Sequence, residues 1–173
     1  MFFTRSLKIA AVIAAGLLLS ACYELEEKIV EVGDYAPIAG KFRCSDMAGK
    51  VVNDEIAQIS GGIIFKDYSY RSADGALMTL IKIEDRRYVA QIEAKDKINV
   101  AFIEINDKGF NLLIPDMMQH GDRIEQFGLE SDVRLTKTMD MTVSVSGDKK
   151  KVLAFFKAHR TSLLMNMASC RNA

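Results

Sequence analysis

YVAQIEAKDKINVAFIEI, at residues 88–105, contains two apolar runs joined by a short polar segment. Valine, isoleucine, alanine and aromatic residues dominate both runs, and the β-branched and aromatic types among them favour strands. The polar separator, Lys95-Asp96-Lys97, has the length of a hairpin turn. We therefore expect residues 88–94 and 98–105 to form an antiparallel hairpin.

Similar runs lie on both sides of this hairpin. They are GKFRCS (40–45), IIFKDYSY (63–70), ALMTLIKI (76–83) and FNLLI (110–114). Gly75 and Gly109 close two of the intervening turns, where glycine supplies the positive φ that such hairpins need. VRLTKTM (133–139) and MTVSVS (141–146) add one more strand pair. The spacing predicts an antiparallel β-meander of about six to eight strands.

Two segments have the apolar spacing of helices. The shorter is Asp116–Leu129, where Gly121 weakens the pattern. The stronger is Asp148–Met165, for which Asp148 is a good N-cap. Its apolar residues recur at intervals of three, four and seven: Val152, Phe155, Phe156, Leu163 and Leu164.

Both faces of the predicted strands carry apolar side chains. In residues 98–105, Val100 and Phe102 alternate with Ala101 and Ile103. A sheet with one face in water shows stricter alternation, so part of the second face must be covered. We predict an α+β fold in which the meander packs with a C-terminal helix and a shorter helix. The alternative is a partly closed barrel similar to that of lipocalins, with a hollow interior.

The N-terminus has the pattern of a secretory signal. Arg5 and Lys8 precede an apolar run from Ile9 to Leu19, which is too short to span a membrane comfortably. The run ends in Leu19-Ser20-Ala21-Cys22, and this resembles the lipobox of bacterial lipoproteins. The resemblance implies cleavage before Cys22, a diacylglyceryl thioether on its sulfur, and a further acyl chain such as palmitate on its amino group. An uncleaved N-terminal helix is the alternative.

The resemblance also implies a location and three parts of the chain. Tyr23 follows the cysteine, in place of the aspartate that retains such proteins in the inner membrane, so we expect attachment to the outer membrane, facing the periplasm. Residues 1–21 are then the signal peptide, residues 22–38 an acidic tether and residues 39–173 a single periplasmic domain. For the tether, an edge strand at Ile29–Val32 is an equal alternative. The balance of 23 basic and 23 acidic residues argues against nucleic acid as a partner.

Cys44 and Cys170 are the cysteines that remain once Cys22 carries lipid. An even number of thiols in an oxidising compartment predicts a disulfide between them. A metal pair and two free thiols are the alternatives, but no C-x-x-C motif or neighbouring histidine supports a metal. We expect Cys170 to follow a helix that folds back over the first core strand, so that the bond joins the end of the domain to its beginning.

The sequence carries little that points to catalysis. G-x-S-x-G, H-E-x-x-H and P-loop motifs are absent, and His120 and His159 lie among apolar residues. We therefore expect a protein without enzymatic activity or cofactor, although an enzyme built on carboxylates alone is left open. Met117, Met118 and His120 offer soft ligands for copper, but methionines more commonly fill gaps in a core.

Lys149, Lys150 and Lys151 stand at the start of the predicted C-terminal helix, where the helix dipole disfavours cations. They suggest a face for anionic lipid head groups, or else a soluble surface.

Our first hypothesis for function is a lipid-anchored envelope protein that binds a partner protein. The second is a carrier of a small hydrophobic ligand in the concavity of the sheet, and the third is a copper-binding module.

Overall fold

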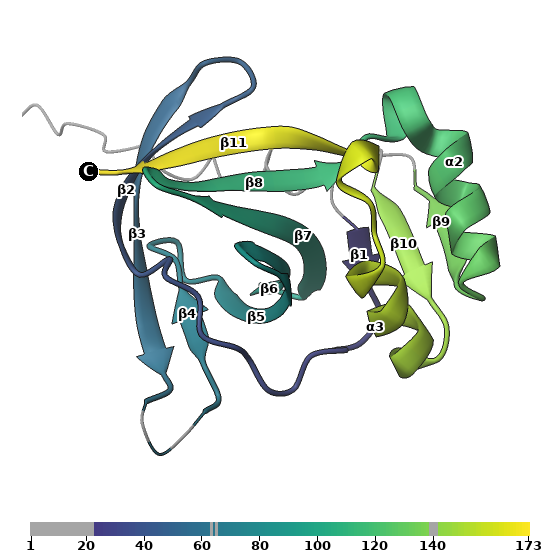
Figure 1. Ribbon diagram of the computed structural model, residues 1–173, viewed down its shortest axis with the longest axis horizontal. Helices are drawn as coiled ribbons and strands as arrows, with labels where there is room; N and C mark the ends of the chain where they lie inside the picture. The colour runs from purple at the N-terminus through teal and green to yellow at the C-terminus, as the bar shows by residue number, and fades with distance from the viewer. Residues whose placement is uncertain (1–22, 63, 65, 139–141) are drawn as a thin grey trace, which may run out of the picture.

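A computed structural model describes residues 23–62, 64, 66–138 and 142–173 of the chain, and Figure 1 shows their arrangement. In this part of the chain, eight strands close into an antiparallel barrel in the order β2-β3-β4-β5-β6-β7-β8-β11. Their bounds are β2 Gly40–Asp46, β3 Val51–Ser60, β4 Ser69–Arg71, β5 Leu77–Glu84, β6 Arg87–Ala94, β7 Lys97–Asn106, β8 Gly109–Pro115 and β11 Leu164–Asn172. The predicted α+β fold with an antiparallel meander is confirmed, and it takes the barrel form.

The meander runs from β2 to β8 in chain order, and β11 completes the ring between β8 and β2. The hairpin at residues 88–105 is confirmed as β6 and β7, which pair with Ala94 opposite Lys97 and Arg87 opposite Glu104. The pairing of β6 with β7 closes the ring, because β5 pairs with the other edge of β6 and β8 with the other edge of β7.

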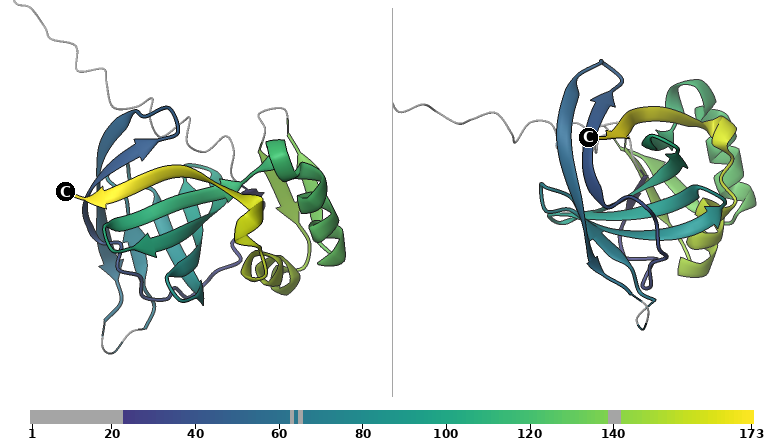
Figure 2. Two further views of the ribbon diagram at one scale, coloured as in Figure 1. Left: turned by 45° about the horizontal axis from the view of Figure 1, so that its top comes forward. Right: turned by 60° about the vertical axis from the view of Figure 1, so that its left-hand side comes forward.

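A smaller sheet extends from β7 on the outside of the barrel. One edge of β7 pairs first with β1 (Tyr23–Leu25) and further along with β8. β10 (Val143–Ser146) lies parallel to β1, and β9 (Arg134–Lys137) is antiparallel to β10. Helices α2 (Met117–Glu130) and α3 (Lys149–Lys157) lie beside this extension, as Figures 1 and 2 show.

The two largest hydrophobic cores of the described residues correspond to these two parts. The first fills the barrel with side chains that include Phe42, Tyr70, Tyr88, Ile103 and Phe110. The second lies between the extension and the helices, and its buried members are Tyr23, Leu25, Ile29, Val30, Val89, Val100, Phe102, Leu113, Ile124, Val133, Val143, Val145, Val152, Phe155, Phe156 and Leu163. Because β7 contributes alternate side chains to each core, both of its faces are apolar.

The predicted C-terminal helix over residues 148–165 is wrong in its second half. Helix α3 ends at Lys157, a short 3₁₀ turn follows at Thr161–Leu163, and Leu164–Asn172 forms β11. Leu163 and Leu164 happen to continue the helical spacing, but the vacant edges of β2 and β8 offer the segment two ladders of hydrogen bonds. The element beside the first core strand is therefore a strand.

The predicted acidic tether is also wrong for the described residues 23–38. Tyr23 is wholly buried in β1, and Ala36 and Ile38 are buried with the barrel core. The edge strand proposed at Ile29–Val32 does not form either, because the backbone there bonds to a side chain. Gln91 Oε1 accepts hydrogen bonds from the N–H groups of Ile29 and Val30, at 2.9 and 3.0 Å.

The strand boundaries near residue 60 differ from the prediction as well. Of the described residues in the run at 63–70, only Ser69 and Tyr70 belong to a strand, β4, whereas β3 begins at Val51. The carboxylate of Asp46 accepts hydrogen bonds from the N–H groups of Ala48 and Lys50, which folds the chain into a tight turn. That turn connects β2 directly to β3.

Candidate functional site

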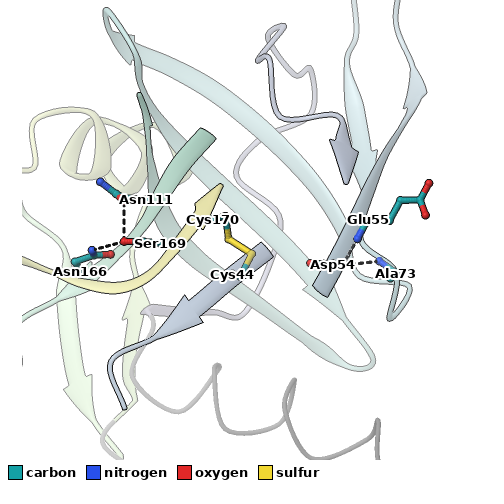
Figure 3. Close-up of a disulfide and its surroundings, with 8 residues drawn as sticks. All are labelled: Cys44, Asp54, Glu55, Ala73, Asn111, Asn166, Ser169 and Cys170. Atoms are coloured by element: carbon teal, nitrogen blue, oxygen red, sulfur yellow. Dashed lines mark hydrogen bonds between the residues drawn. A yellow bond between two sulfur atoms is a disulfide. The ribbon is translucent and has the colours of Figure 1, made fainter. Parts of the chain in front are cut away.

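Cys44 and Cys170 form a disulfide between β2 and β11, shown in Figure 3. The two cysteines lie directly opposite each other in the strand register, with a Cα–Cα distance of 3.9 Å. Next to Cys170, the Ser169 hydroxyl donates a hydrogen bond to Asn111 Oδ1 and accepts one from Asn166 Nδ2. The disulfide and this polar cluster secure β11 as the last strand of the barrel. The predicted lipidation residue, Cys22, lies outside the described residues.

Tyr23 is fixed in the second core by its ring and by its hydroxyl. The ring makes edge contacts with Phe155 and Phe156 of α3, at centroid distances of 5.7 and 5.3 Å. The hydroxyl lies 2.8 Å from His159 Nε2, and burial raises the pKa of Tyr23, so the phenol keeps its proton. The first residue after Cys22 is therefore part of the folded domain.

His159 is completely buried, which distinguishes it from a titrating surface histidine. Burial lowers the pKa of His159 to about 4, so the imidazole is neutral near neutral pH and accepts a hydrogen bond from the Tyr23 hydroxyl at Nε2. Arg87 lies nearby and donates a hydrogen bond from Nη2 to the His159 carbonyl at 3.4 Å. The hydrogen bond between Tyr23 and His159 holds β1 in the second core.

The three copper candidates lie in the first turn of α2 and have different surroundings. Met117 packs against the second core. Met118 is 82% exposed on another side of the first turn of α2. His120 interrupts the helix with non-helical backbone angles. Among the described residues, no group of three or more His, Cys, Asp or Glu side chains is arranged to hold a metal ion.

Two of the three lysines in the first turn of α3 form ion pairs. Lys149 Nζ lies 3.2 Å from Glu27 Oε2, and Lys151 pairs with Asp132. The hydrogen bond from Lys151 holds the pKa of the Asp132 carboxyl below its usual range. These contacts connect the start of α3 to neighbouring segments and reduce its free positive charge.

A surface groove lies outside the barrel, between α2, β9 and the turn that enters α3. Its volume is about 730 Å³. Leu129, which is 79% exposed, together with Val133 and Leu135 forms its apolar part. Gly147 and Asp148 line it from the β10–α3 turn. We refer to this feature as the α2–β9 groove.

The charges of the α2–β9 groove are mostly compensated. Glu125 Oε1 lies 2.6 Å from Lys137 Nζ, and Asp132 pairs with Lys151. Asp148 accepts hydrogen bonds from the N–H groups of Lys150 and Lys151 as the N-cap of α3. Arg134 is exposed and, within the described residues, makes no ion pair. The groove therefore presents apolar side chains beside one available guanidinium group.

The barrel interior, by contrast, is occupied by the protein's own side chains. Phe42 and Phe110 lie 5.0 Å apart inside it, and the Tyr70 hydroxyl bonds to both the N–H and the carbonyl of Ala36. One polar group inside lacks a partner: the buried amide of Asn99 makes no hydrogen bond with the described residues. Asn99 shares a face of β7 with Ile103, so it points into the barrel.

Comparison with known protein families, curated proteins and solved structures gives no match. In the described residues, no helix is long and apolar enough to cross a membrane.

The sequence did not indicate Leu129 or Arg134, because an isolated leucine and an arginine on a hairpin are ordinary surface residues. Gln91 gave a clearer signal, since it is the one polar residue in YVAQI.

Proposed function

We propose that this protein is a lipid-anchored, non-enzymatic protein of the cell envelope that binds a partner protein in the α2–β9 groove. The observation that carries the proposal is the contrast between a barrel filled by aromatic side chains and an open groove on the outside. The anchor is supported by the lipobox-like sequence that ends at Cys22, and the outer membrane is the proposed location.

The chemistry of the groove specifies the kind of partner. Leu129 and Leu135 provide apolar surface, and arginine is enriched at the energetic centres of protein interfaces. Because the acidic groups of the groove already have cationic or backbone partners, an approaching lysine gains little there. An apolar side chain flanked by a carboxylate fits better, since the carboxylate can form a bidentate pair with Arg134.

The groove can be tested by site-specific photo-crosslinking in cells. A photoreactive phenylalanine derivative in place of Leu129 should form a discrete cross-linked product, and Arg134→Glu in the same chain should remove it. Met47 is the matched control position, because it is 63% exposed but lies in the β2–β3 turn, outside the groove. Equal cross-linking from both positions, or a product insensitive to Arg134→Glu, would contradict binding in the groove.

The anchor is tested separately by fractionation. The wild-type protein should sediment with outer membranes, whereas Cys22→Ser should be released into the soluble fraction or stay unprocessed. Two or three acyl chains give effectively permanent attachment, because each buried methylene contributes about 0.8 kcal/mol. Recovery of a cleaved Cys22→Ser protein in membranes would show that lipid on Cys22 is not the anchor.

The second candidate function is carriage of a small ligand in the barrel, and the orphaned amide of Asn99 favours it. A closed barrel of about eight strands has room either for its own side chains or for one small ligand. A ligand with a polar group would satisfy Asn99, because buried polar groups normally have partners. Asn99→Leu should then abolish retention of the ligand while the barrel stays folded.

A further inference from the structure

The described chain leaves no spacer between Cys22 and the folded domain. Tyr23 is the next residue, it is wholly buried, and its strand pairs on both sides with β7 and β10. One extended residue spans about 3.5 Å. A lipid attached to Cys22 therefore holds the N-terminal end of β1 within a few ångströms of the membrane surface.

The strand register identifies which part of the domain surrounds that end. Tyr23 lies opposite Val143 of β10, which in turn lies opposite Lys137 of β9. Adjacent strands are about 4.8 Å apart, so Lys137 is about 10 Å from Tyr23 across the sheet. Thr142 precedes Val143 at this end of β10, and Thr138 donates hydrogen bonds from its N–H and its hydroxyl to the Thr142 carbonyl. Lys137 and Thr138 are both exposed.

The α2–β9 groove is at the opposite end of the same strand pair. Ser146 lies opposite Arg134, and both residues line the groove together with Asp148 at the start of α3. Arg134 and Lys137 are three residue steps apart along β9, which corresponds to about 10 Å. Figure 1 agrees, with α3 following the end of β10 that lies away from the start of β1.

We propose that the domain rests directly on the lipid surface, with the Lys137–Thr138 end of the β9–β10 pair at the head groups and the α2–β9 groove facing away. This orientation rests on the lipid anchor proposed above. It makes the groove accessible to a partner in the periplasm. It also places Lys149–Lys151 away from the lipid, because they follow the far end of β10.

Tryptophan fluorescence can test the orientation, because the chain contains no tryptophan. The lipidated Thr138→Trp and Lys150→Trp proteins would each be reconstituted into phosphatidylcholine vesicles that carry a nitroxide quencher on the head group. Thr138→Trp should lose most of its emission, whereas Lys150→Trp should keep it. Lys137→Trp serves as a second probe of the same end if Thr138→Trp does not fold.

The controls separate the orientation from the anchor. Flotation of the lipidated protein with vesicles, and loss of flotation in Cys22→Ser, establishes the anchor. If the protein floats but Lys150→Trp is quenched more than the probes at the β9 end, or if no probe is quenched, the orientation is wrong while the anchor stands. If the lipidated protein does not float, both the anchor and the orientation are wrong.

Discussion

Acidification should destabilise this domain through His159. The imidazole has a pKa of about 4 in the folded protein, against a usual value of 6.5, because burial penalises its charged form. The unfolded chain therefore binds more protons than the folded one between these two pKa values. The free energy of unfolding therefore falls as the pH is lowered through this window. The loss attributable to His159 is about 3 kcal/mol between about pH 7 and about pH 4.

Urea denaturation at a series of pH values measures this effect, with His159→Gln as the comparison. Glutamine does not titrate but can still bond to the Tyr23 hydroxyl, so the variant should lose less stability on acidification than the wild type. Carboxylates contribute equally to both proteins, and the difference between the two pH profiles isolates the histidine. Identical profiles would show that His159 does not stay buried and neutral in the folded protein.

Three further predictions concern stability. Phe155→Ala should lower the free energy of unfolding by about 3–5 kcal/mol in chemical denaturation, because it leaves a cavity in the second core. Replacing both Cys44 and Cys170 with alanine should cost up to about 5 kcal/mol, measured by thermal unfolding, because the bond closes a loop of 126 residues in the unfolded chain. Gln91→Leu should speed hydrogen exchange at the amides of Ile29 and Val30 and lower stability by about 2 kcal/mol, since it removes their acceptor. Unchanged exchange at those amides would mean that Gln91 does not hold the segment.

The meander could be predicted from the sequence because its signals are local. In residues 88–105 the two strands, their turn and their partners are contiguous, so residue type and spacing are enough. The disulfide was also predictable, since its pairing follows from the number of cysteines left after Cys22. The two apolar strand faces also suggested a partly closed barrel. The strand that closes it was not predicted, because β11 pairs with β2 and β8, which are far from it in sequence.

The wrong predictions of a helix over residues 148–165 and a tether over residues 22–38 have the same physical origin, which is contact between segments far apart in the sequence. Leu163 and Leu164 fit a helical period, and only the available edges of β2 and β8 select a strand after them. The acidic composition of residues 22–38 suggested a tether, yet Tyr23 packs on α3, which lies more than a hundred residues along the chain. The groove combines side chains from three separate segments, so no local pattern marks it.

Native mass spectrometry of the soluble Cys22→Ser domain tests most directly whether function resides in the groove or in the barrel. We expect a single species with the mass of the polypeptide and its disulfide, because aromatic side chains occupy the barrel. Asn99→Leu should then be at least as stable as the parent, since it removes an unpartnered polar group from the interior. A co-purifying small molecule that is released on denaturation, and that Asn99→Leu no longer retains, would instead assign the function to the barrel.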